Sequence, residues 1–142
     1  DHVAEAVAAG ITISEFPTTL QAARAARQSG MRVIMGAPNL VRGGSHSGNA
    51  SAAELAGQGL LDGLSSDYVP SSLLHAAFLL HGVVGIPLHR AIATVTANMA
   101  DMLGLPDRGV IEPGRRADLV RVRLDGDLPV VLTVWREGRR VA

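Results

Sequence analysis

Asp67 is the side chain of this sequence that is best suited to catalysis. It lies within residues 64–68 (LSSDY), at the end of a short run that predicts a β-strand. A carboxylate just past the end of a strand can bind a divalent metal ion and can accept a proton from metal-bound water. An aspartate at this place can also cap the next helix or stabilise a turn, so the residue alone leaves both roles open.

A second set of polar side chains lies between residues 36 and 50 (GAPNLVRGGSHSGNA), which the sequence predicts to be one long loop. Long loops in compact domains are usually functional or disordered. The glycines would allow backbone amides, together with Arg42 and His46, to reach phosphate oxygens. Asn39 and Asn49 share this loop, and all four side chains are candidate phosphate-binding residues. A flexible surface loop has a similar composition, and no lysine follows the glycines as in a P-loop.

Glu15 ends the first expected strand, where its carboxylate would face the same rim as Asp67. It is a candidate metal ligand, although a rim carboxylate more often pairs with a neighbouring arginine. Two apolar helices are expected at residues 71–84 and 87–96. They carry three histidines, His75, His81 and His89, which are expected to be core or surface residues, since no pair has a four-residue ligand spacing. The sequence also lacks His-x-His, so these residues cannot make a complete catalytic zinc site, which usually needs three protein ligands.

Three successive units of strand, loop and helix position these side chains. Strands are expected near residues 11–15, 31–35 and 61–65, and polar, glycine-rich residues follow each of them. Thr18 or Thr19 is expected to cap the helix after the first strand, and Ser51, in a capping box with Glu54, the helix before the third. Such units imply right-handed crossovers and a parallel sheet. In a (β/α) barrel the loops after the strands form the active face.

The pattern of expected elements changes after Asn98, from units of strand, loop and helix to strands separated by turns. Turn signals at residues 107–109, 112–114 and 125–127 flank two runs, 117–124 and 130–136, that predict antiparallel strands. The chain is therefore expected to be an α/β protein with barrel elements at residues 1–106 and a small β appendage at residues 107–142.

Composition restricts the class of protein. Of 142 residues, 47% are hydrophobic and 18% charged, which is enough for a buried core. A net charge of zero argues against nucleic acid or an acidic membrane as the main partner. Cysteine is absent, which excludes disulfides and fits a reducing cytoplasm. The longest apolar stretch, residues 73–86, is too short and too interrupted to span a bilayer. The chain begins with Asp1 and has no leader, so its N-terminus is expected to be cut.

Several motifs together resemble the phosphonate-metabolism diphosphatases of the amidohydrolase superfamily. They are spread in the right order over essentially all 142 residues: 14–19 (SEFPTT), 35–39 (MGAPN), 42–49 (RGGSHSGN), 64–70 (LSSDYVP), 107–109 (DRG) and 115–120 (RRADLV). The ending at residues 114–119 is common to most amidohydrolases and supports only the superfamily. The resemblance implies strands six to eight of a (β/α)8 barrel and part of a small β-sandwich.

The resemblance also implies a reaction, the hydrolysis of α-D-ribose 1-methylphosphonate 5-triphosphate to the 5-phosphate and diphosphate. Asp67 aligns with the strand-eight aspartate that binds a metal of the zinc or manganese class and accepts the proton of the attacking water. The phosphorylated sugar would be held by Arg42, His46 and the rest of their loop. Glu15 stands where many members have a strand-six histidine ligand, which leaves the metal count and its own role open.

Most of the superfamily's ligands would lie upstream of Asp1, so this chain alone is expected to be inactive. Two alternatives remain: another amidohydrolase acting on a cyclic amide or a base, which the glycine-rich loop disfavours, and a catalytically inactive barrel that serves as a scaffold. Assembly into a homo-oligomer is left open.

Overall fold

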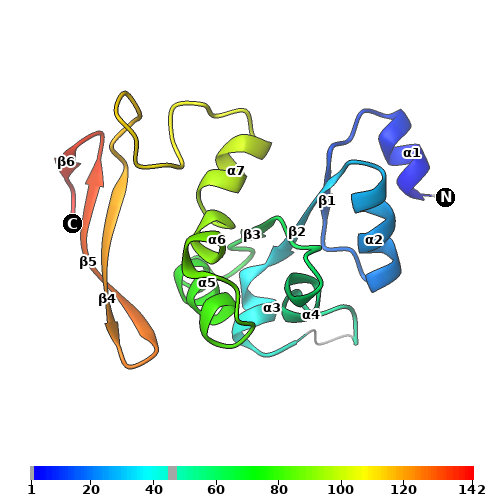
Figure 1. Ribbon diagram of the computed structural model, residues 1–142, viewed down its shortest axis with the longest axis horizontal. Coiled ribbons are helices and arrows are strands. Elements are labelled where there is room, and N and C mark those ends of the chain that lie inside the picture. Colours follow the sequence, from blue (N-terminus) through cyan, green and yellow to red (C-terminus); the bar gives the residue numbers. More distant parts are fainter. Residues whose placement is uncertain (1, 45–47) are drawn as a thin grey trace.

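The computed structural model of the protein describes residues 2–44 and 48–142. The three expected strands are present as β1 (Ile13–Glu15), β2 (Arg32–Gly36) and β3 (Gly63–Ser65). They form one sheet in the order β1-β2-β3, and both pairs are parallel, as the sequence predicted. Figure 1 shows the sheet at the centre of the larger part of the molecule, with helices around it.

Two of the N-terminal helices begin where the sequence placed their caps. Helix α1 (His2–Ala8) precedes β1, α2 (Leu20–Gln28) follows it, and α4 (Ala52–Gly57) precedes β3. Thr19 caps α2, because its hydroxyl accepts a hydrogen bond from the backbone N–H of Ala22 at 3.0 Å. Ser51 caps α4 in the same way through the N–H of Glu54 at 3.0 Å. Both predicted N-caps are confirmed.

The expectation of one loop over residues 36–50 is wrong in its first third. Helix α3 (Ala37–Val41) begins directly after β2. Pro38 lies in its first turn, where a proline is tolerated because the missing N–H would have no partner within the helix. The loop that follows α3 is therefore shorter than expected, and it begins at Arg42, the C-cap of the helix.

Three helices lie between β3 and the C-terminal sheet. These are α5 (Ser72–Gly82), α6 (Leu88–Ala93) and α7 (Ala97–Met102). The sequence predicted one helix over residues 87–96, whereas α6 ends earlier and α7 follows as a separate helix that was not expected. The carbonyl of Thr94, between them, accepts a hydrogen bond from the N–H of Leu64 at 3.0 Å and ties this turn to β3.

The two faces of the parallel sheet differ in character. Val33, Met35 and Leu64 are buried against α2, α4 and α5, where small alanines allow close packing. The register places Glu15, Ile34 and Gly63 side by side, and Gly36 beside Ser65, on the other face.

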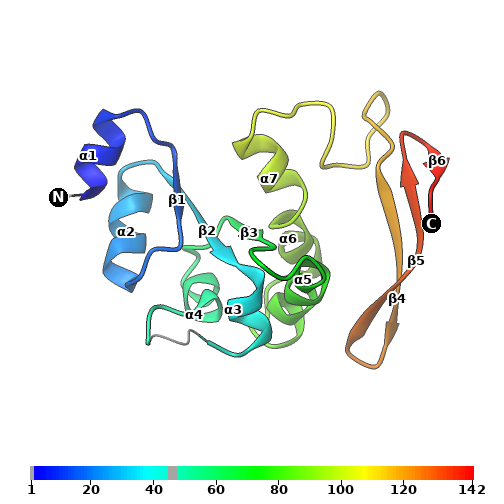
Figure 2. The same ribbon diagram turned by 180° about the vertical axis from the view of Figure 1, so that it is seen from behind.

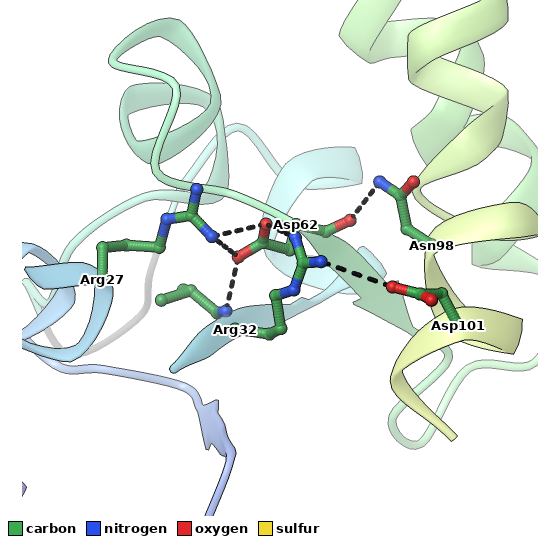
Figure 3. Close-up of polar contacts among 6 residues, drawn as sticks. Arg27, Arg32, Asp62, Asn98 and Asp101 are labelled. Carbon is green, nitrogen blue, oxygen red and sulfur yellow. Dashed lines mark hydrogen bonds and ion pairs between the residues drawn. The ribbon is translucent and has the colours of Figure 1, made fainter. Parts of the chain in front are cut away.

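A buried carboxylate holds the opposite end of the sheet together. Asp62, immediately before β3, accepts hydrogen bonds from Arg27 at 2.7 Å and from the backbone N–H of Val33 at 2.8 Å (Figure 3). Arg32 approaches the same carboxylate at 3.3 Å and also reaches Asp101 at 3.3 Å. These contacts tie α2, β2, β3 and α7 together at the N-terminal ends of the strands.

The C-terminal residues form a separate antiparallel sheet of β4 (Leu119–Asp125), β5 (Leu128–Arg136) and β6 (Arg139–Arg140). The antiparallel strands expected at residues 117–124 and 130–136 are thus confirmed. Figures 1 and 2 show this sheet apart from the parallel one, reached through the extended segment after α7. Its strands carry many exposed aliphatic side chains, among them Val120, Leu124, Leu128 and Val131. The proposed division into 1–106 and 107–142 stays a prediction.

Within the described residues, no helix combines the length and hydropathy that crossing a membrane requires.

Candidate functional site at the carboxyl ends of the strands

Asp67 occupies an unusual backbone conformation just after β3. Its φ of 48° lies in the left-handed region, which is uncommon for residues other than glycine and is found mainly at turns and functional sites. This conformation directs the carboxylate over the end of β2. A Cβ atom added at Gly36 would lie 3.3 Å from the Oδ2 atom of Asp67.

Phe16 makes the matching arrangement at the end of β1. Its φ is 54°, and its N–H donates to the carbonyl of Ile34 at 2.9 Å, which fixes it beside β2. The ring edge also approaches Gly36, since a Cβ atom there would lie 3.2 Å from Cε1 of Phe16. Two side chains on left-handed backbone, from the two outer strands, therefore converge on the glycine that ends the middle strand.

A cavity of about 160 Å³ opens at this point. Its walls come from the ends of all three strands, from α3 and from the segment that precedes α4, and they include Asp67, Asn39 and Asn49. The structure thus brings together three of the candidates, and it does so at the carboxyl ends of the strands, where the sequence placed the site. A volume of this order can hold a few water molecules or one small anionic group.

The two asparagines are held there in different ways. The side-chain oxygen of Asn39 accepts a hydrogen bond from the N–H of Ala52 at 2.9 Å, so Asn39 joins α3 to α4 and only its amide N–H groups remain to donate. Asn49 is exposed, and the next residue, Ala50, is anchored because its N–H donates to the carbonyl of Thr18 at 2.9 Å.

Arg42 lies beside the residue that follows Asp67. Its Cζ atom is 5.5 Å from the centre of the Tyr68 ring, within the range of a cation–π contact. Tyr68 was not singled out from the sequence, although its place next to Asp67 was visible. His46, the other candidate of this loop, lies outside the described residues.

Glu15 does not line the cavity. It ends β1 with an exposed side chain, on the sheet face that it shares with Gly36 and Ser65. Its role as a ligand stays a prediction. None of His75, His81 and His89 lines the cavity either, and the Nδ1 atom of His81 lies 2.8 Å from the carbonyl oxygen of Ile86.

The donors present fit one part of a divalent metal site. In residues 2–44 and 48–142, no cluster of three or more His, Cys, Asp or Glu side chains could hold an ion. The Asp67 carboxylate accepts no hydrogen bond from this part of the chain and is therefore available as one ligand. The Ser65 hydroxyl is buried without a partner among the same residues, on the face shared with Gly36. A metal here would need further ligands from outside the described residues.

Comparison with known proteins places this geometry in context. The family described as “Amidohydrolase family” matches residues 3–142. The alpha-D-ribose 1-methylphosphonate 5-triphosphate diphosphatase of Escherichia coli K12 is 54% identical over 142 residues, which is 99% of this chain and 38% of that protein. The 5-methylthioadenosine/S-adenosylhomocysteine deaminase of Desulfitobacterium hafniense DCB-2 is 33% identical over 91 residues, or 56% of this chain and 21% of that protein. The chain thus spans well under half the length of these relatives.

Two solved structures share the fold. An amidohydrolase from Thermotoga maritima MSB8 superimposes with a TM-score of 0.60 and 18% identity, covering 92% of this chain and 43% of that one. An uncharacterised protein gives a TM-score of 0.68 and 20% identity, covering 98% and 42%. At these identities the likeness concerns the fold alone.

Proposed function

This chain belongs to the amidohydrolase family, and we propose that it is part of a metal-dependent diphosphatase that hydrolyses α-D-ribose 1-methylphosphonate 5-triphosphate to the 5-phosphate and diphosphate. The observation that carries the proposal is the Asp67 carboxylate, which has no hydrogen-bond partner within residues 2–44 and 48–142 and lines a cavity at the strand ends, in a sequence 54% identical to a diphosphatase. Because the chain matches only 38% of that relative, the activity is assigned to a longer parent protein.

The proposal includes the architecture of the parent. Strands β1 to β3 would be strands six to eight of a (β/α)8 barrel, with residues 1–106 in the barrel and 107–142 in a composite β-sandwich. The parallel order β1-β2-β3 and the antiparallel C-terminal sheet support this arrangement. The cytoplasmic location expected from the cysteine-free sequence is part of the same proposal.

Asp67 has two tasks in the proposed mechanism. A divalent ion of the zinc or manganese class would supply acidification of the attacking water, towards a pKa of ~7. Asp67 would provide one carboxylate ligand for this ion and would accept the proton of the water that attacks the triphosphate. The products require cleavage between the α and β phosphates, and the left-handed backbone at Asp67 holds its carboxylate at the wall of the cavity in which we place the attacking water.

The remaining candidates bind the anionic substrate. Asn39 donates through its amide N–H groups, and Asn49, which also lines the cavity, donates in the same way. Arg42 and His46 neutralise negative charge on the phosphates. Phosphoryl transfer depends mainly on such electrostatic stabilisation and on positioning, and little on covalent catalysis by the protein.

A second candidate is hydrolysis at the ring of a base. The 33% identity to a deaminase over 91 residues favours it, whereas the identity to the diphosphatase is higher and covers nearly the whole chain. A catalytically inactive scaffold is the third outcome to be tested.

The test is to incubate the metal-loaded parent protein with the triphosphate and to measure diphosphate release. A matched reaction with 5-methylthioadenosine is followed for ammonia. We expect diphosphate release that falls by ~10²–10⁴-fold in the Asp67→Asn variant, which keeps the shape and loses the charge. Ammonia in place of diphosphate would support the second candidate, and neither product would mean a scaffold. The 142-residue chain alone should release no diphosphate.

A further inference from the structure

Tyr68 is a large aromatic side chain whose position has no explanation in the core. The residue is 60% exposed, and it directly follows Asp67, which lines the cavity. Its backbone is held in a turn, because the N–H of Val69 donates to the carbonyl of Ser66 at 3.0 Å. The turn therefore holds the ring outside the sheet, and the contact that it makes there is with a guanidinium group.

That contact determines where Arg42 can act. The guanidinium carbon lies over the Tyr68 ring at 5.5 Å from its centre. An arginine has many rotamers in solution, and a ring beneath its guanidinium reduces this freedom. A guanidinium that rests on a ring keeps its N–H groups at the edge of its plane, where they can donate to phosphate oxygens in pairs.

We propose that Tyr68 is a positioning residue for the polyphosphate of the substrate and that it acts through Arg42. The ring of the residue next to Asp67 restricts the guanidinium, so that less of the Arg42 side chain has to be ordered when the phosphate chain binds. The inference rests on the proposed function and adds a residue to it. It requires only the ring of Tyr68, because the hydroxyl plays no part in a cation–π contact.

The experiment compares Tyr68→Leu with Tyr68→Phe in the full-length parent. Binding of inorganic tripolyphosphate is measured by calorimetry, and turnover of the triphosphate is measured separately. The Leu variant should weaken tripolyphosphate binding and raise KM about two- to fivefold, the range of an exposed cation–π contact. Its kcat and metal content should stay near those of the wild type. The Phe variant should match the wild type in every measurement.

Arg42 provides the second arm. Arg42→Lys keeps the charge but loses the planar group, so it should weaken tripolyphosphate binding as Tyr68→Leu does. In an Arg42→Ala background, the further change Tyr68→Leu should have no effect. Arg90→Ala is the matched control, because this exposed arginine on α6 lines a different cavity and its loss should leave binding unchanged.

Three results would overturn the inference: wild-type affinity in Tyr68→Leu, equal losses in the Phe and Leu variants, or additive losses in the double variant. The proposed function fails by a different result, the absence of diphosphate release from the wild-type parent. Calorimetry with tripolyphosphate needs no turnover, so it tests the role of Tyr68 whether or not the parent releases diphosphate. Should Tyr68→Leu fail to fold, Tyr68→Gln at this exposed position takes its place, with the same expected losses and the same absence of effect in the Arg42→Ala background.

Discussion

The missing side chain of Gly36 leaves the space that the carboxylate of Asp67 occupies. A Cβ atom at position 36 would lie 3.3 Å from Oδ2 of Asp67, closer than such atoms normally approach. The φ of Gly36 is −72°, an ordinary value for any residue, so the glycine is needed for space and not for backbone freedom.

The first prediction follows from this contact. Gly36→Ala in the parent protein should shift the carboxylate by a few tenths of an ångström and lower turnover by about tenfold, because catalysis is sensitive to small misplacements. The cost in the free energy of unfolding should be about 1 kcal/mol, as for modest overpacking. Kinetics and urea unfolding measure the two effects.

Gly82→Ala is the control for this prediction. Gly82 ends α5, and a Cβ atom there would meet nothing within 4 Å. The change should leave turnover unaltered and stabilise the helix by about 0.5–1 kcal/mol. Unchanged turnover in the Gly36 variant would show that Asp67 does not need its present position.

The second prediction concerns the buried carboxylate at the other end of the sheet. Asp62→Ala leaves the Arg27 guanidinium and the Val33 N–H without their acceptor. The expected loss of stability is about 2–3 kcal/mol, below the usual range for a fully buried pair because Arg27 is one-third exposed. Urea unfolding of the parent protein is the measurement. Asp101→Ala removes only an exposed contact to Arg32 and should cost less than about 0.5 kcal/mol.

The third prediction separates metal binding from phosphate binding. Asp67→Asn should lower the affinity of the parent for its metal, whereas Arg42→Ala should weaken substrate binding at unchanged metal content. Elemental analysis beside steady-state kinetics distinguishes the two, and chelation should abolish turnover reversibly. Loss of metal in a His46→Ala variant would move that residue from the phosphates to the ion.

The fourth prediction concerns acid. The pKa of Asp118 lies below its ordinary value, first because the backbone N–H of Glu137 donates to its carboxylate at 2.8 Å and then because Arg116 pairs with it at 2.8 Å. A lowered pKa in the folded state means that the stabilisation is complete above the ordinary value of 3.8 and is lost as the pH falls through the lower one.

Nuclear magnetic resonance can follow this loss at the amide of Glu137. Its chemical shift should change only below pH 3.8, and the Asp118→Asn variant should show no such transition. A midpoint at or above the ordinary value in the wild type would mean that the contact contributes nothing.

Local patterns predicted most of the fold. The β-branched and apolar runs gave the three parallel strands, and the hydroxyls of Thr19 and Ser51 gave two helix starts, because both signals act over a few residues. Helix α3 was missed, since glycine and proline around it are typical of loops and only its packing in the fold selects a helix.

The site was predictable in its location but less so in its details. Asp67, Asn39 and Asn49 could be placed at one rim because parallel strands end together. The contact of Asp67 with Gly36 and that of Tyr68 with Arg42 depend on backbone conformations and distances that no spacing encodes. The Asp62 network was missed for the same reason, since its arginines are some 30 residues away in sequence.

The parallel and the antiparallel sheet are expected to form at different rates. In the C-terminal sheet Asp125 pairs with Leu128 across a tight turn, whereas Glu15 must find Ile34, and Met35 must find Leu64, across a whole helical crossover. Hairpins close within about 1–10 μs, while pairings distant in sequence form more slowly. During synthesis the parallel strands leave the ribosome first, yet we expect the last strands to be the faster to pair.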